Sequence, residues 1–208
     1  MDNIPLPLDK FSVSSNREKT SVVLVATGSY NPPTYMHLRM LELARDALNS
    51  EGYHVIGGYL SPVNDAYNKR AKQSSYQRTL TVLTRVKSFL CENGLVSPDS
   101  LQVMLVCGSD LLESFATPGV WIPEQVQALC RDFGVACIRR EGKDVEKIIL
   151  SNDILNENKN NIKIVDELIS NQISSTRIRD CITRGLSVKY LTADEVIDYI
   201  RKHNLYLH

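Results

Sequence analysis

Two segments that lie far apart in the chain carry residue types that bind phosphate groups. The first, residues 28–37, reads GSYNPPTYMH. Gly28 has no Cβ, so a phosphate can approach the backbone there, and the predicted helix that follows offers free N–H groups and a partial positive charge. His37 lies in the first turn of that helix, three residues after Thr34, so its ring and the threonine hydroxyl can face the same anion. The spacing alone also fits a tight strand-to-helix turn with an incidental histidine.

The second segment, residues 173–179, reads ISSTRIR and places three hydroxyl groups and two guanidinium groups at a predicted helix start. Backbone N–H groups, hydroxyl groups and arginines are the donors that hold the oxygens of a polyphosphate. Ile178 and Ile182 are spaced to share a buried face. Arg177 and Arg179 flank that face on opposite sides, so we expect only one of them to reach a ligand. A capped helix with solvated arginines is the alternative interpretation.

The apolar pattern predicts the scaffold that positions these segments. Continuous apolar runs at residues 22–26, 53–60, 101–107, 135–138 and 162–165 are typical of buried parallel strands, and helical patterns lie between them. This alternation predicts an α/β fold: a doubly wound, Rossmann-like parallel sheet with helices on both faces and a C-terminal helical region. One C-terminal helix is expected to start at Ser174, and the other at Thr192, whose spacing to Glu195 fits a capping box. Ligands of such sheets bind beyond the carboxyl ends of the strands, where the winding reverses.

Composition narrows the range of partners and locations. The 24 Lys and Arg residues balance the 24 Asp and Glu residues, which argues against a nucleic acid or an anionic membrane surface as partner. No apolar run approaches the roughly 18 residues of a membrane-spanning helix. Residues 1–20 are polar and lack the apolar core of a secretory signal, so we expect a flexible arm before a single domain at residues 21–208. Five scattered cysteines without C-x-x-C spacing favour reduced thiols in an intracellular protein of the nucleus or cytoplasm, and a homo-oligomer stays open.

Several motifs together carry a resemblance to a known family. GSYNPPTYMHLRM and ISSTRIR resemble the paired signatures of the nucleotidylyltransferase superfamily, whose (H/T)-x-x-H motif would be Thr34 to His37. SPVNDAYNK, VCGSDLL, TPGVW and SVKYL are similar to motifs of the eukaryotic nicotinamide/nicotinate mononucleotide adenylyltransferases, most of all the plant members, from about Val22 to Tyr206. This resemblance implies transfer of AMP from ATP to nicotinamide or nicotinate mononucleotide (NMN or NaMN), giving NAD or deamido-NAD and pyrophosphate. It also implies Mg²⁺, bound mainly through the ATP phosphates rather than by protein ligands.

The resemblance further implies roles for individual residues. His37 stabilises charge at the α-phosphate, Lys69 reaches phosphate as a point charge, and Arg179, the last arginine of its motif, holds the ATP tail in preference to Arg177. Asp110 accepts from ribose hydroxyls. Trp121, the only tryptophan, stacks on the pyridine ring; without the resemblance it would be taken as a core residue. The full set of implied substrate-binding positions is Gly28, Ser29, Thr34, Tyr67, Gly108, Asp110, Trp121, Arg140, Asn171, Ser174 and Thr176.

The sequence departs from the family in one place. Only nine residues separate Lys69 from Thr79, where the family has a helix, a strand and a Pro-Trp-Glu motif. That strand is an outer member of the sheet, so its loss can leave the remaining strand order intact while exposing an edge. We therefore expect contacts with ATP to be retained better than contacts with the mononucleotide.

Two alternative functions stay open from the sequence. The first is a shortened nucleotide-binding protein with impaired catalysis, because the missing motif carries the second aromatic plate of the pyridine site. The second is adenylyl transfer to another phosphate acceptor such as phosphopantetheine, against which Trp121 and the SPVND motif argue.

Overall fold

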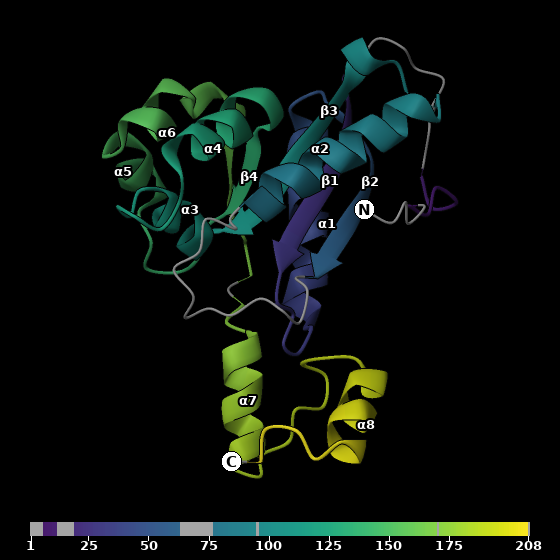
Figure 1. Cartoon of the computed structure of the whole chain (residues 1–208). Helices are drawn as coiled ribbons and strands as arrows, with labels where there is room; N and C mark the ends of the chain where they lie inside the picture. Colours follow the sequence, from purple (N-terminus) through teal and green to yellow (C-terminus); the bar gives the residue numbers. More distant parts are fainter. Residues whose placement is uncertain (1–5, 12–18, 63–76, 95, 170, 208) are drawn as a thin grey trace.

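A five-stranded parallel sheet forms the centre of the computed structural model (Figure 1), which describes residues 6–11, 19–62, 77–94, 96–169 and 171–207. The strand order is β2-β1-β3-β4-β5, and every neighbouring pair is parallel. The strands are β1 (Ser21–Gly28), β2 (His54–Pro62), β3 (Leu101–Gly108), β4 (Val135–Ile138) and β5 (Ile162–Val165). The predicted doubly wound α/β fold is confirmed, with β2 at an edge of the described sheet.

The winding of the sheet reverses between β1 and β3. The chain passes from β1 to β2 on one side, and then crosses back over β1 so that β3 pairs on the other side. Residues 22–26 of β1 are buried because helices cover both faces of this central strand. Gly28 and Gly108 end the two strands that border the reversal. The crevice between these strand ends is therefore where a ligand of this fold is expected to bind.

Helices cover both faces of the sheet, as predicted. Helix α1 packs on one face through Met36, Leu43, Ala44 and Leu48. The other face is covered by α2 and by the shorter helices that follow β3 and β4. Within the described ranges, no helix combines the length and apolar character needed to cross a bilayer. The helical elements up to β5 are α1 (Tyr35–Ser50), α2 (Gln77–Glu92), η1 (Pro98–Ser100), α3 (Ser109–Phe115), α4 (Pro123–Ala128), η2 (Leu129–Phe133), α5 (Val145–Leu150), α6 (Asp153–Glu157) and η3 (Lys159–Asn161).

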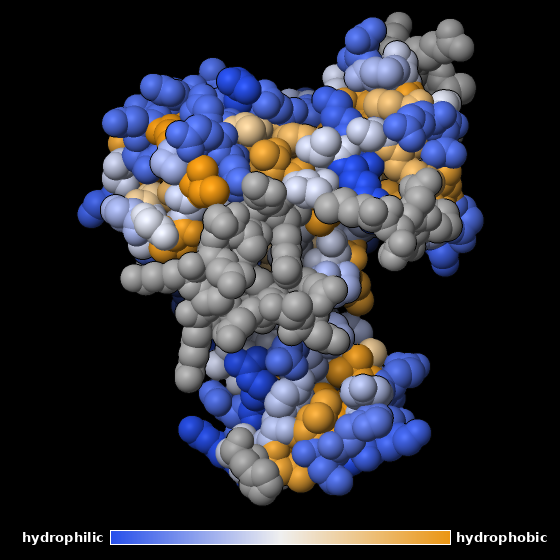
Figure 2. All heavy atoms as spheres, in the orientation of Figure 1, coloured by the Kyte–Doolittle hydropathy of each residue, from blue (hydrophilic) through white to orange (hydrophobic). Residues whose placement is uncertain are grey.

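Two C-terminal helices, α7 (Ser175–Thr183) and α8 (Asp194–Lys202), lie beyond the carboxyl end of β1 (Figure 1). They form a small core of their own around Ile178, Val188 and Ile197. Figure 2 shows apolar atoms at the surface of this unit, where the exposed fractions of Leu186 and Leu207 are 56% and 50%. The predicted C-terminal helical region is confirmed.

Part of the N-terminal segment packs against the sheet. The Tyr59 hydroxyl on β2 donates to the Pro7 carbonyl over 2.9 Å, and the rings of Phe11 and Tyr59 lie 5.5 Å apart. Atoms of the Phe11 ring stand 2.9 Å from the point where a Cβ on Gly57 would lie. Residues 6–11 therefore cover part of β2, instead of extending as the loosely attached arm expected from the sequence. The division into an arm and a single domain otherwise stays a prediction.

Candidate active site

The loop between β1 and α1 forms one wall of the candidate site. Tyr30, with φ of 43°, folds its ring back over the strand end, and its hydroxyl donates to the Ala26 carbonyl over 2.7 Å. A Cβ on Gly28 would stand 3.3 Å from this ring, so glycine lets the loop close tightly here. Ser29 is exposed at the tip of the turn. The carboxyl end of β1 is therefore covered by the Tyr30 ring, and the exposed Ser29 stands beside it.

His37 is fixed in one tautomer by the residue that precedes α1. The backbone N–H of Thr34 donates to His37 Nδ1 over 2.9 Å, and the Thr34 hydroxyl lies 3.1 Å from the same atom. Because a backbone N–H can only donate, Nδ1 is the acceptor and the ring proton sits on Nε2. Burial, and then the positive charge of Arg140, lower the pKa of His37. The imidazole is therefore neutral near pH 7 and can donate one hydrogen bond from Nε2.

The end of β3 forms the opposite wall. Ser109, which is fully buried, donates to the Ile138 carbonyl over 3.3 Å and accepts from the Arg140 N–H over 2.8 Å. Arg140 Nη1 lies 2.8 Å from Asp110 Oδ2 in the first turn of α3. A Cβ on Gly108 would stand 3.2 Å from Arg140 Nε, so the guanidinium crosses the strand end closely. The structure thus brings together three positions that the sequence analysis singled out: Gly108, Asp110 and Arg140.

The start of α7 contacts the β1–α1 loop directly. Ser175 Oγ donates to the Pro32 carbonyl over 2.8 Å, and Arg179 Nη1 donates to the Asn31 carbonyl over 2.6 Å. The second terminal nitrogen of Arg179 donates to Thr176 Oγ1 over 3.2 Å. Ser174 caps α7 by accepting from the Arg177 N–H. The two phosphate-type segments of the sequence therefore meet at the carboxyl end of β1, although more than 140 residues separate them.

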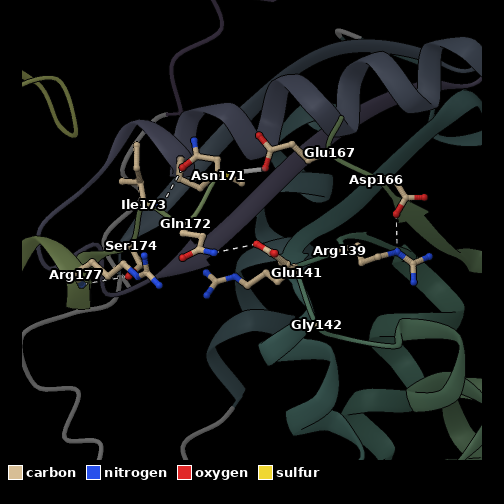
Figure 3. A pocket seen from close by; sticks show the side chains of 12 residues that line it. Arg139, Glu141, Gly142, Asp166, Glu167, Asn171, Gln172, Ile173, Ser174 and Arg177 are labelled. Carbon is tan, nitrogen blue, oxygen red and sulfur yellow. Dashed lines mark hydrogen bonds and ion pairs between the residues drawn. The ribbon is translucent and has the colours of Figure 1, made fainter. Parts of the chain in front are cut away.

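A cavity of about 660 Å³ opens between the start of α7 and the loop after β4 (Figure 3). Among its lining residues are Arg140, Asn171 and Ser174, together with Arg177 rather than Arg179. The positive charge of Arg139 on the cavity wall is balanced by two carboxylates, because Asp166 and Glu146 both accept hydrogen bonds from its guanidinium and raise its pKa. The full lining consists of Met36, Arg139, Arg140, Glu141, Gly142, Asp166, Glu167, Asn171, Gln172, Ile173, Ser174 and Arg177.

Comparison with known proteins decides the family. A cytidylyltransferase-like family matches residues 25–181. A nicotinamide/nicotinic acid mononucleotide adenylyltransferase of Arabidopsis thaliana is 60% identical, over 98% of this chain and 98% of the relative. Relatives of the same description from Oryza sativa and Bos taurus are 55% and 37% identical, over 98% and 92% of this chain and 94% and 90% of their own lengths. This chain belongs to the nicotinamide/nicotinic acid mononucleotide adenylyltransferase family. The resemblance drawn from the motifs is thereby confirmed.

Solved structures support the fold of this adenylyltransferase. The Plasmodium falciparum nicotinic acid mononucleotide adenylyltransferase complexed with NaAD gives a TM-score of 0.53 at 17% identity, covering 89% of this chain and 97% of that one. The same Plasmodium enzyme complexed with APC gives a TM-score of 0.52 over 89% and 96%. At this identity the likeness concerns the fold alone, and it agrees with the sheet described above.

The alignment with the Arabidopsis relative spans 233 positions, more than the 208 residues of this adenylyltransferase. Some residues of the relative therefore have no counterpart here. The family motifs predict that this gap lies between Lys69 and Thr79. Lys69 and Tyr67, two implied site residues, lie outside the residues that the structure describes.

Trp121 is attached to the scaffold beside α3. Its indole N–H donates to Ser114 Oγ over 2.9 Å, and its ring meets Phe115 edge to face at 4.8 Å. Trp121 is only partly buried against the core, so part of its surface stays accessible. Its stacking on a pyridine ring stays a prediction, and these contacts show how the ring is held.

Two residues that organise the site were not given a role in the sequence analysis. Tyr30 covers His37, with the two rings 4.8 Å apart and nearly perpendicular, and Ser109 ties the ends of β3 and β4 together. The only local signal for Ser109 is its place between a strand-end glycine and an acidic residue in VCGSD. Its partners lie about thirty residues further along the chain, where no sequence spacing connects them.

The donor set of the site suits phosphate better than a cation. Within the described part of the chain, no group of three or more His, Cys, Asp or Glu side chains could hold a metal ion. The donors gathered at the strand ends are a neutral imidazole, hydroxyls and guanidiniums, which can bind anionic oxygens, and the Asp110 and Asp166 carboxylates beside them are ion-paired with arginines. The residues present do not form a metal coordination sphere, and we assign none of them to Mg²⁺.

Proposed function

We propose that this chain carries out the reaction for which its family is named: transfer of AMP from ATP to NMN or NaMN, forming NAD or deamido-NAD and pyrophosphate. The observation that carries this proposal is the direct contact between the β1–α1 loop and α7. Arg179 and Ser175 donate to consecutive carbonyls of the loop that leads to His37. A polyphosphate laid along this junction would meet donors from both segments.

The chemistry needs no covalent intermediate on the protein. An oxygen of the mononucleotide phosphate attacks the α-phosphorus of ATP in line, one P–O bond forms, and the bond to the β-phosphate bridging oxygen breaks to release pyrophosphate. Positioning and stabilisation of charge supply most of the catalysis in such transfers. In our proposal His37 donates its Nε2 proton in a hydrogen bond to an α-phosphate oxygen. Its neutral state, supported by the lowered pKa, makes it a hydrogen-bond donor rather than an acid.

On the ATP side, we assign the tail to the start of α7. Ser174 contributes the N-cap of α7, Thr176 a hydroxyl and Arg179 a guanidinium, and Arg177 on the cavity wall is a further candidate. Gly28 and Ser29 would line the phosphates, and Gly108 and Asp110 the adenosine. Asp110 is ion-paired with Arg140, so a ribose hydroxyl would share this carboxylate with the guanidinium.

On the mononucleotide side, the proposed contacts are Trp121, Arg140 and Asn171, with Tyr67 and Lys69 implied by the family motif. Asn171 lines the cavity and accepts from the Ile173 N–H, which fixes its amide. One aromatic plate is worth about 0.5–1.5 kcal/mol beyond the area it buries. Loss of this stacking contribution alone corresponds to about twofold to tenfold weaker mononucleotide binding, and the buried area lost with the ring adds to it.

Mg²⁺ belongs to the proposal as a companion of ATP. It would be held by phosphate oxygens and water, which is its usual mode in nucleotide enzymes. We also propose an intracellular location, in the nucleus or cytoplasm, supported by five cysteines that are all free.

The test is direct. Purified protein incubated with ATP, Mg²⁺ and either NMN or NaMN should form the dinucleotide, measured by chromatography, and His37→Ala should lower kcat about 100-fold or more, as expected for loss of one donor at the reacting phosphate. Absence of product, or equal rates for parent and variant, would reject the proposal.

A second function, a nucleotide-binding protein with impaired turnover, is favoured by one observation: the relative has residues that this chain lacks. Calorimetric titration separates the two. Binding of ATP together with NMN supports the enzyme, and binding of ATP alone supports the impaired form.

A further inference from the structure

A tyrosine that follows α8 contacts the β1–α1 loop. The Tyr206 hydroxyl donates to Asn31 Oδ1, although 175 residues separate the two. The Thr183 hydroxyl on α7 lies 3.0 Å from the Tyr206 carbonyl and 3.0 Å from the Arg179 carbonyl, so these two carbonyls share its proton. Asn31 lies in the first phosphate-binding segment of the sequence, whereas Thr183 and Tyr206 lie outside both segments.

Asn31 is thereby held at two points. Its carbonyl accepts from Arg179 Nη1 and its side chain from Tyr206. These two bonds differ in what a bound nucleotide would do to them. In the proposed function Arg179 also binds the ATP tail, so the tail would compete with the Asn31 carbonyl for its guanidinium. The Tyr206 bond has no such competing role and can hold Asn31 in both states.

We propose that Tyr206 is a positioning residue of the ATP site, which acts through Asn31 to keep the β1–α1 loop in place when Arg179 engages phosphate. The inference rests on the proposed function. Burial raises the pKa of Tyr206, against the opposing charge of Arg179, so the phenol stays protonated and able to donate. Tyr206 itself need not touch the nucleotide.

The test variant is Tyr206→Phe, which removes one hydroxyl and keeps the ring. Tyr190→Phe is the matched control, because Tyr190 lies in the same C-terminal unit with an exposed fraction of 79%. Because one hydrogen bond is lost, we expect the ATP dissociation constant, measured by calorimetry, and KM for ATP to rise about threefold to tenfold. KM for NMN and kcat at saturating ATP should stay within about twofold of the parent, and the control should match the parent throughout.

A double-mutant cycle decides whether the effect passes through Asn31. In the background Asn31→Ala, the change Tyr206→Phe should have no further effect on ATP affinity. An equal effect in both backgrounds overturns the inference, as does a lower melting temperature with unchanged ATP affinity, which is the result of a merely structural role. The calorimetric measurement needs no turnover. Absence of dinucleotide would therefore reject the proposed function, while the ATP affinities still decide this inference.

Discussion

Ser109 offers a quantitative test of how the site is assembled. The change Ser109→Ala removes a fully buried hydroxyl that accepts from the Arg140 N–H over 2.8 Å and donates to the Ile138 carbonyl over 3.3 Å. A buried group left without its partner costs about 1–3 kcal/mol, and the shorter bond carries most of this. We expect a loss of about 2 kcal/mol in the free energy of unfolding, or about 4–8 °C in melting temperature for a chain of this size.

The same change should affect the site, because the Arg140 backbone is what Ser109 holds. A shift of Arg140 alters its ion pair with Asp110 and should lower kcat/KM for the mononucleotide. Denaturant unfolding and steady-state kinetics measure the two effects, with Ser151→Ala as control, since the exposed Ser151 hydroxyl makes one bond of similar length, 2.9 Å to the Ile148 carbonyl. If both serine variants lie within about 0.5 kcal/mol of the parent, the reasoning about the buried hydroxyl is refuted.

Three further predictions concern the phosphate-binding side of the site. The pKa of His37 is lowered in the folded chain, so the unfolded chain binds more protons once the pH falls below the free imidazole value of about 6.5. The free energy of unfolding should therefore decline below that pH. In urea titrations His37→Gln should flatten the decline, and pH profiles that coincide for parent and variant would contradict this. The change Gly28→Ala sets a Cβ 3.3 Å from the Tyr30 ring, and the resulting displacement should lower kcat/KM for ATP by about tenfold, whereas an unchanged value would show that the loop tolerates it. Chelation of Mg²⁺ should stop dinucleotide formation and excess Mg²⁺ should restore it, and turnover that persists in excess chelator would remove the metal from the proposal.

Local patterns were sufficient to predict the scaffold and the two segments that meet in it. The buried run of β1 and the turn residues after it are contiguous, so apolar pattern and composition indicate strand, loop and helix. The relation between the segments follows from the topology of the sheet, because the carboxyl ends of parallel strands share one edge.

Contacts between residues far apart in the chain could not be predicted from the sequence. The spacing of Thr192 to Glu195 predicts a capping box, but Ala193 occupies the N-cap position of α8 without a side-chain cap, and the Thr192 hydroxyl donates to the Pro33 carbonyl, 159 residues away. Helical periodicity predicts that Arg177 and Arg179 lie on opposite sides of the buried face, but it could not tell that the first lines the cavity while the second bonds to the loop. Such bonds depend on tertiary packing, which spacing along the chain does not encode.

The junction between the β1–α1 loop and α7 has a consequence for synthesis on the ribosome. The strand that leads into the loop is made early, but the serine that bonds to the Pro32 carbonyl is made 143 residues later. A nascent chain can therefore form its first parallel strands while the proposed nucleotide-binding site is still incomplete. Translation that stops before α7 would leave a polypeptide with all five described strands but without this junction, so the proposed dinucleotide formation should depend on synthesis of α7.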